Sequence, residues 1–349
     1  MYSRKLETSS KAKAVNDHRK LIILLIPKYF PTSRQSYPGN RDISASPKLL
    51  SMKIGIVVSD PMDWTAQALL ASFSRKGIDA FFLDFSELIA SIGDDLIFRS
   101  GDADLLDLDC LVVRDLGRRG AVDVSFRFEV LQYLMQKGIP VINSPEAIAR
   151  AANKFATSRA LHDRGVPTPK TIVTASPEEA EEALRNFGEA VSKPLFGYKG
   201  RDILLLKSGD LSDLVRLRSI VQDQGLVYLQ EFVATENDSA RDIRAFVVDG
   251  KTLGAIFRIA PPGQWISNLA RGGRAEACPL TSELEGLAEK SARAIGATYC
   301  GVDLLETHHG LSVIEVNGTP SGKGIYESLG IDVTEAIADH VIGLLDSRR

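Results

Sequence analysis

Runs of apolar residues alternate with amphipathic stretches from residue 52 onward. The segment 54–58 is continuously apolar, which is typical of a strand that is buried on both faces. A segment with helical spacing, 64–76, follows it and ends at Gly77. Further strands are predicted at 80–85, 110–113 and 140–142, and a helix near 130–137. This alternation predicts a small α/β domain with a parallel sheet.

The pattern changes after residue 144. Ser144 followed by Pro145 is a typical helix start, because serine caps the first turn and proline fits the first helical position. We expect one long helix that continues to about Arg164 and ends at Gly165. Strand-rich hairpins mixed with helices follow Pro169, which predicts an α+β region with antiparallel sheets. Its strands are predicted at 171–174, 190–194, 202–207, 227–233, 241–248, 253–259, 300–306 and 311–317, and its helices at 177–186, 211–222, 282–295 and 333–345.

The bulk composition is that of an ordinary globular protein. The 349 residues carry a formal net charge of −3, and 44% of them are hydrophobic. Because there is no basic excess, we expect no nucleic-acid partner, and no apolar run is long enough for us to expect a membrane span. The cysteines are scattered and odd in number, so we expect buried thiols in a cytoplasmic protein rather than disulfides or a zinc site. They are Cys110, Cys278 and Cys300.

Residues 1–51 are rich in Ser, Lys and Arg and show no periodic pattern. We interpret them as a disordered extension, or as the product of a start site assigned upstream of the real one at Met52. A clean first strand begins at Lys53, directly after that methionine, which favours the second interpretation.

The most informative chemical signal is an acidic hairpin near the C-terminus. Two apolar strands, 301–306 and 311–317, are joined by a polar turn. Because side chains alternate along a strand, Glu315 and Asn317 share one face, and Asp303 on the facing strand can join them. Two carboxylates and an amide oxygen suit a hard cation such as Mg²⁺ that also holds nucleotide phosphates. The alternative is a solvated sheet face lined by two acids.

Three further segments carry groups that suit a nucleotide. Lys193 ends a strand before the Gly-Lys loop 197–200, where glycines let backbone amides approach an anion. Residues 230–233 close an apolar strand whose end offers backbone hydrogen bonds to a flat heterocycle. Arg271, in the polar loop 268–273, is suited to bidentate hydrogen bonds to a phosphoryl group. Plain turn chemistry and an edge strand are the alternatives for the first two segments.

Two charged patterns allow more than one interpretation. Asp242 and Arg244 place opposite charges on one strand face. These charges could belong to a binding site, and a cross-strand ion pair would explain them equally well. Arg114, Arg118 and Arg119 form a basic loop after a strand of the parallel sheet, where ligands usually bind. The alternative for this loop is a solvated turn.

Taken in chain order, these motifs resemble those of the ATP-grasp ligases, and more narrowly the RimK-type glutamate ligases. The resemblance covers residue 52 to the C-terminus, and its first and last segments, 53–66 and 317–325, are most similar to the branch that adds glutamate to tetrahydromethanopterin. It implies an ATP-grasp fold preceded by a small Rossmann-like, pre-ATP-grasp α/β domain. The domains would then be the extension 1–51, the Rossmann-like domain 52–148, and the nucleotide- and metal-binding ATP-grasp domain 149–349.

The resemblance also implies a role for each residue of the site. Arg271 would be catalytic, because it would stabilise an acyl phosphate and the tetrahedral intermediate. Asp303, Glu315 and Asn317 would hold two Mg²⁺ or Mn²⁺ ions. The nucleotide would be bound by Lys154, Lys193, Gln230, Glu231, Phe232, Val233, Asp242, Ser267 and Asn268. One departure is Ile266, where many relatives carry Arg or Lys, and it weakens any phosphate contact at that position.

The implied reaction is amide-bond formation between L-glutamate and a small-molecule carboxylate acceptor, driven by ATP, with GTP left open as the co-substrate. The acceptor would be tetrahydromethanopterin, and a pterin side chain ending in carboxylates would suit the basic loop. The alternatives are the polyglutamate tail of a deazaflavin coenzyme, a ribosomal protein C-terminus, and a nucleotide-binding regulator without catalysis. We expect a homo-oligomer with no nucleic-acid or membrane partner.

Overall fold

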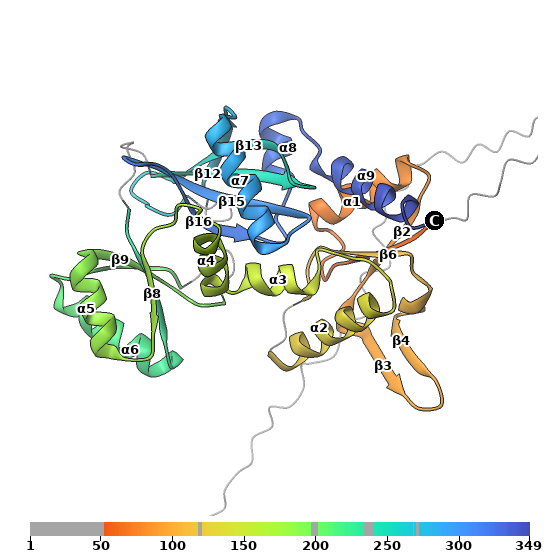
Figure 1. The fold of residues 1–349 in the computed structure, drawn as a ribbon, viewed down its shortest axis with the longest axis horizontal. Helices are drawn as coiled ribbons and strands as arrows, with labels where there is room; N and C mark the ends of the chain where they lie inside the picture. Colours follow the sequence, from red (N-terminus) through yellow and green to blue (C-terminus); the bar gives the residue numbers. More distant parts are fainter. Residues whose placement is uncertain (1–51, 118–120, 197–201, 234–239, 268, 270–271) are drawn as a thin grey trace, which may run out of the picture. The chain divides into compact units, whose positions relative to one another are not determined.

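The computed structural model describes residues 52–117, 121–196, 202–233, 240–267, 269 and 272–349, which belong to one compact unit (Figure 1). The predictions for residues 1–51, for the Gly-Lys loop 197–200, and for Arg118, Arg119, Asn268 and Arg271 lie outside the described residues.

The first region contains a four-stranded parallel sheet, as the alternation of strands and helices predicts. The strand order is β2-β1-β6-β7, and each neighbouring pair runs parallel. Its strands are β1 (Lys53–Val57), β2 (Asp79–Leu83), β6 (Cys110–Val113) and β7 (Val141–Ile142). Strand β6 is buried throughout and β1 beyond its first residue, which explains why both are continuously apolar in sequence.

A small antiparallel sheet in this region is not predicted by the sequence pattern. Its order is β3-β4-β5, and its strands are β3 (Leu88–Ile92), β4 (Leu96–Ser100) and β5 (Ala103–Asp104). Isoleucines 89, 92 and 97 are exposed on it while Phe98 is buried, so its apolar residues do not all lie on one buried face. Two short 3₁₀ helices flank it, η1 (Phe85–Glu87) and η2 (Leu105–Asp107).

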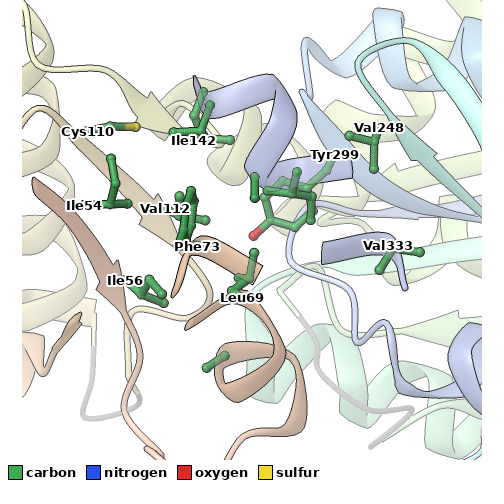
Figure 2. Packing of buried hydrophobic residues seen from close by; sticks show 14 of the residues in the cluster. Ile54, Ile56, Leu69, Phe73, Cys110, Val112, Ile142, Val248, Tyr299 and Val333 are labelled. Atoms are coloured by element: carbon green, nitrogen blue, oxygen red, sulfur yellow. The ribbon is translucent and has the colours of Figure 1, made fainter. Parts of the chain in front are cut away.

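The C-terminal helix packs against the first helix of the chain. Helix α1 (Trp64–Arg75) and helix α9 (Val333–Asp346) lie side by side (Figure 1). Their shared core includes Tyr299, the first residue of a strand far from α1 in sequence, which lies among residues of β1, α1 and α9 (Figure 2). Helix α2 (Ala121–Gln136) begins nine residues before the predicted start.

The long helix predicted from Pro145 to Arg164 is wrong, because two helices occupy this stretch. Helix α3 (Pro145–Ala152) ends and helix α4 (Lys154–Asp163) begins at Asn153, whose backbone is extended, with φ −94° and ψ 106°. The Asn153 side chain caps α4 by accepting a hydrogen bond from the Ala156 amide at 3.1 Å. Asn153 also pairs with Phe196 as an isolated antiparallel bridge, so the break ties this segment to the region after β9.

Two antiparallel sheets follow, as predicted. The four-stranded sheet has the order β10-β9-β11-β8 and is covered by α5 and α6 (Figure 1). These elements are β8 (Thr171–Thr174), α5 (Pro177–Phe187), β9 (Glu189–Lys193), β10 (Leu204–Lys207), α6 (Leu211–Gln224) and β11 (Val227–Glu231).

The five-stranded sheet has the order β14-β13-β12-β15-β16, and helix α7 packs on one of its faces. Its elements are β12 (Arg241–Val248), β13 (Lys251–Ile259), β14 (Arg274–Cys278), α7 (Ser282–Ile295), β15 (Tyr299–Thr307), β16 (Gly310–Asn317) and α8 (Lys323–Leu329). Strand β14 and helix α8 are not predicted, and both border the cavity described below.

Two predictions about the whole chain can be compared with these residues. All three cysteines are free and buried, as expected. Among the described helices, none has the length and apolar character needed to span a membrane.

Candidate active site

A cavity of about 850 Å³ brings together most of the residues that the sequence singles out. It lies where the antiparallel four-stranded sheet and the five-stranded sheet meet α3, α4, α8 and the loop after β16. The predicted site residues that line it are Lys154, Lys193, Gln230, Glu231, Phe232, Val233, Asp242, Ser267, Asp303, Glu315 and Asn317.

The acidic hairpin presents its three ligand candidates on one face, as predicted. Asp303 on β15 lies directly opposite Glu315 on β16, and Asn317 lies opposite Gly301. The register shifts by one residue immediately after Asp303, so that Leu304 pairs with Val313. This β-bulge brings the two carboxylates opposite each other, because pairing continued from the turn would place Ile314 there.

Asp303 takes part in a buried ion-pair network across three strands. Arg244 donates to both of its carboxylate oxygens, with Nη2 at 2.8 Å from Oδ2, and Arg258 Nη2 also lies 2.8 Å from Oδ2. Arg258 forms a second bidentate pair with Asp242, with both distances 2.6 Å. Burial alone would raise the pKa of Asp303, but Arg244 and Arg258 hold it below the ordinary value.

The network contains the cross-strand ion pairs that the pattern of Asp242 and Arg244 allows, and both residues also line the cavity. Each forms a cross-strand ion pair, Asp242 with Arg258 on β13 and Arg244 with Asp303 on β15. Arg258 is a site residue that the sequence analysis missed. The sequence does not reveal this role, because another β-bulge, between Phe246 and Val247, sets the register that brings Arg258 opposite Asp242.

The two lysines reach the cavity from different elements. Lys154 is the first residue of α4, so the helix break at Asn153 fixes its position, and its Nζ lies 3.0 Å from Glu315 Oε1. Lys193 ends β9, and its Nζ donates to Gln230 Oε1 at 2.7 Å. Burial lowers the pKa of Lys193 to about 8.

The end of β11 forms an apolar compartment of the cavity. The Phe232 amide donates to the Glu189 carbonyl at 3.0 Å, which holds the strand end against β9. The rings of Phe232 and Trp265 meet edge to face with centroids 6.1 Å apart. Trp265 is another site residue that the sequence analysis missed, since a lone tryptophan in an irregular segment carries no periodic signal. The compartment suits a flat, apolar-faced group next to the charged end of the cavity.

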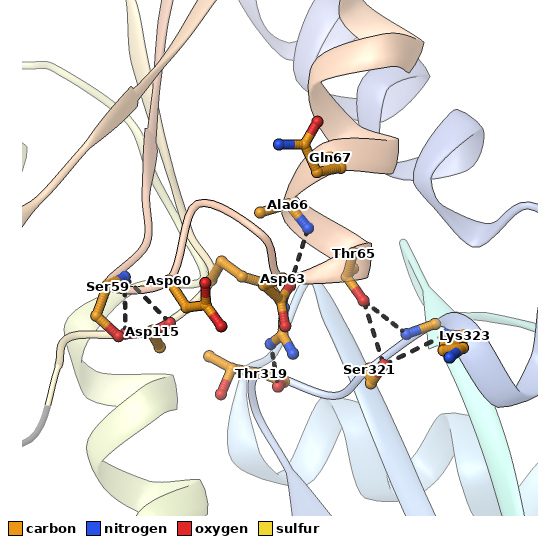
Figure 3. A network of polar contacts seen from close by, with 12 residues as sticks. Ser59, Asp60, Asp63, Thr65, Ala66, Gln67, Asp115, Thr319, Ser321 and Lys323 are labelled. Atoms are coloured by element: carbon orange, nitrogen blue, oxygen red, sulfur yellow. Dashed lines mark hydrogen bonds and ion pairs between the residues drawn. The ribbon is translucent and has the colours of Figure 1, made fainter. Parts of the chain in front are cut away.

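In the loop after β6, the Arg114 side chain is buried and hydrogen-bonded rather than solvated. The Arg114 side chain is 9% exposed and pairs with Asp63, with Nε 2.9 Å from Oδ1. It also donates to the Thr319 carbonyl in the loop after β16 (Figure 3). Lys323 directly follows this loop as the first residue of α8, and its Nζ lies 3.5 Å from Glu327 Oε1.

The donor set at the acidic hairpin fits a hard cation in kind but not in number. In the part of the chain that the structure describes, no three His, Cys, Asp or Glu side chains converge as a metal cluster. Two carboxylates and one amide oxygen therefore form an incomplete shell. Such a set suits Mg²⁺ or Mn²⁺, which keep water and phosphate oxygens as their remaining ligands.

Comparison with known proteins places the chain in a family. The RimK-like ATP-grasp domain matches residues 151–341. The chain is 42% identical to the tetrahydromethanopterin:alpha-L-glutamate ligase of Methanosarcina acetivorans, and the match covers 84% of this chain and 99% of that protein. The enzyme of the same name from Methanocaldococcus jannaschii is 38% identical, with coverage of 85% and 100%.

Solved structures show the same fold at low sequence identity. The ATP-grasp ligase PsnB, complexed with minimal precursor, Mg and ADP, aligns with a TM-score of 0.65 and 20% identity over 84% of this chain and 98% of that one. The RimK domain ATP-grasp protein of Sphaerobacter thermophilus aligns with a TM-score of 0.63 and 21% identity over 82% and 98%. The predicted ATP-grasp fold with a preceding parallel-sheet region is thus confirmed. The chain belongs to the RimK-like ATP-grasp family.

Proposed function

We propose that this protein is an ATP-dependent ligase that joins L-glutamate to a tetrahydromethanopterin-type acceptor and releases ADP and phosphate. The relatives named tetrahydromethanopterin:alpha-L-glutamate ligase support this acceptor, because the similarity extends over nearly their whole length. The "probable alpha-L-glutamate ligase" relatives, at 26–31% identity, support the amino acid but name no acceptor.

The observation that carries the proposal is the meeting of two lysines and the acidic hairpin in one cavity. Lys154 Nζ lies 3.0 Å from the Glu315 carboxylate, and Lys193 lines the same cavity from the end of β9. Burying two cations next to two acids around an open cavity is costly for a protein. A polyanionic ligand that binds these charges would explain why they are there. A nucleoside triphosphate with divalent cations would engage both signs of charge.

Each residue of the site would have its own role in binding the nucleotide, the cations or the acyl group. Lys154 and Lys193 would hold the phosphates, and the strand end 230–233 with Trp265 would hold the base. Two Mg²⁺ or Mn²⁺ ions, bound by Asp303, Glu315 and Asn317, would neutralise charge on the triphosphate when bound. Asp242, Ser267 and Asn268 would complete the nucleotide site, and Arg271 would stabilise the charge that develops on the acyl group.

The chemistry needs no nucleophile from the protein. An oxygen of the acceptor carboxylate attacks the γ-phosphorus, the bond to the β-phosphate oxygen breaks, and ADP leaves. The glutamate amine then attacks the acyl carbon, the carbon–oxygen bond to phosphate breaks, and the amine loses its proton as phosphate departs. The protein contributes by positioning the reactants and by neutralising charge.

The setting of the reaction is also part of the proposal. The described thiols are buried and unpaired, which suits a reducing cytoplasm. We infer a homo-oligomer as the working form, with ATP or GTP as the co-substrate.

The test is an ADP-release assay with L-glutamate and one acceptor at a time. Tetrahydromethanopterin, a polyglutamylated deazaflavin coenzyme and a ribosomal protein C-terminal peptide are compared, and mass spectrometry follows the gain of a glutamyl residue. We expect Glu315→Gln to lower turnover by more than about 100-fold. Glu276→Gln, on β14 of the same sheet but outside the cavity lining, is the matched control and should stay near wild type. Turnover with another acceptor alone, or an active Glu315→Gln, would contradict the proposal.

A further inference from the structure

Three hydrogen bonds hold the turn after β16. Asn317 Oδ1 accepts from the Thr319 amide at 2.9 Å, so the proposed ligand atom is tied to its own turn. The Gly318 carbonyl accepts from Asn143 Nδ2 at 2.6 Å. The Thr319 carbonyl accepts from Arg114 Nη1. Both Asn143 and Arg114 belong to the first region of the chain, far from β16 in sequence.

Arg114 is itself fixed from the opposite side. Its Nε lies 2.9 Å from Asp63 Oδ1, the oxygen that also caps α1 through the Ala66 amide. The dashed contacts in Figure 3 join this loop of the first region to the turn that contains Thr319. The guanidinium therefore bridges the start of α1 and the end of the acidic hairpin, with two of its nitrogen atoms in use.

This bridge restricts how Asn317 can move. Thr319 precedes Pro320, which narrows its backbone freedom, and its amide and carbonyl are both hydrogen-bonded. An amide oxygen has two lone pairs, so Asn317 Oδ1 can accept from Thr319 and still offer the second to a cation. Hydrogen bonds of this kind orient a ligand atom and strengthen metal binding.

We propose that Arg114 is a positioning residue, which aims the Asn317 amide oxygen at the divalent cation by holding the Thr319 carbonyl. The proposal rests on the function inferred above only in taking Asn317 as a cation ligand. The first region would then influence cation affinity in addition to any contact with the acceptor, because Arg114 holds the turn that follows Asn317.

The test measures Mn²⁺ binding rather than turnover. The protein with a non-hydrolysable ATP analogue is titrated with Mn²⁺, and the free ion is followed by electron paramagnetic resonance. We expect Arg114→Met to weaken Mn²⁺ binding by roughly tenfold, at the lower end of the effect of outer hydrogen-bond partners. Arg114→Lys keeps the charge on one ammonium nitrogen but loses the planar fork that reaches both partners, so it should fall between wild type and Arg114→Met.

Arg127 provides the matched control. It is as buried as Arg114, pairs with Asp123 at 3.0 Å and donates to the Leu116 carbonyl, yet it does not line the cavity. Arg127→Met should leave Mn²⁺ affinity within about twofold of wild type, even if both methionine variants lose similar thermal stability.

Several results would overturn the proposal. Unchanged Mn²⁺ affinity in Arg114→Met, or an equal loss in Arg127→Met, would show that Arg114 has no specific effect on the cation. Should Arg114→Met fail to fold, Asp63→Asn is the second test. Asparagine still caps α1, but it has no negative charge to hold the Arg114 guanidinium. A loss of at least about twofold in Mn²⁺ affinity is then expected, and an unchanged affinity refutes the proposal. A wild type that binds Mn²⁺ but ligates no glutamate would contradict the proposed function alone.

Discussion

Replacement of Arg258 by methionine tests the buried network most directly. Arg258 is 7% exposed and forms a bidentate pair with Asp242 and a further contact with Asp303. Methionine fills similar space but leaves Asp242 without its partner, while Arg244 still neutralises Asp303. Removal of one member of a buried pair typically costs about 3–5 kcal/mol.

The expected shift in melting temperature follows from the size of the unit. Residues 50–349 form it, and an unfolding entropy of roughly 2 cal/mol/K per residue gives about 0.6 kcal/mol/K. The melting temperature of the ligand-free protein should therefore fall by roughly 5–8 °C. Differential scanning calorimetry in the absence of metal and nucleotide measures it.

An exposed Arg–Asp pair on a helix serves as the control. Arg159 lies 2.8 Å from Asp163 on α4, and more than half of each side chain is exposed. Arg159→Met should lower the melting temperature by about 1 °C or less, because solvent screens such pairs. Asp242→Asn in the Arg258→Met background should restore part of the loss by removing the unpaired charge. If Arg258→Met melts within about 2 °C of wild type, burial does not make this network costly to break, and the reasoning fails.

Three further predictions follow from other contacts. Because burial lowers the pKa of Lys193 to about 8, affinity for an ATP analogue should fall as pH rises through that value, and Lys193→Met should abolish this pH dependence in calorimetric titrations. Asn153→Ala removes the cap that separates α3 from α4, so it should cost about 1 kcal/mol and raise the KM for ATP by displacing Lys154, whereas an unchanged KM would refute the role of the break. Hydrogen bonds from Lys76 lower the pKa of Glu335 to about 2, so the stability that this carboxylate adds is present above about pH 4.5 and is lost as pH falls toward 2. The melting temperatures of wild type and Glu335→Gln should converge across that window, and a constant difference would contradict the assignment.

Ion pairs offset the cost of burying charge around the cavity. Buried charges are costly unless they are paired, and here Asp303 is neutralised by Arg244 and Arg258, and Glu315 by Lys154. A cation and a polyphosphate that bind at these residues would compete with the present partners.

Local sequence signals determined most elements of this protein. Helix α7 and strands β6, β8 and β12 have the predicted bounds, because strong periodicity and clear caps mark them. Alternation along β16 sufficed to place Glu315 and Asn317 on one face, and the order of motifs indicated the ATP-grasp family. Local patterns missed the sheet β3–β5, whose isoleucines are exposed, and the break at Asn153, where the chain pairs with the distant Phe196.

Only the tertiary structure decided which charges meet. Turns of two residues would by themselves pair Asp242 with Phe257 and Asp303 with Ile314, and a one-residue β-bulge in each hairpin replaces these partners with Arg258 and Glu315. A shift of one residue moves every side chain of a strand to the other face, so the sequence supplied the charged groups but not their pairing. The bridge from Arg114 to the turn after β16 depends likewise on how two distant parts of the chain pack, which no local pattern encodes.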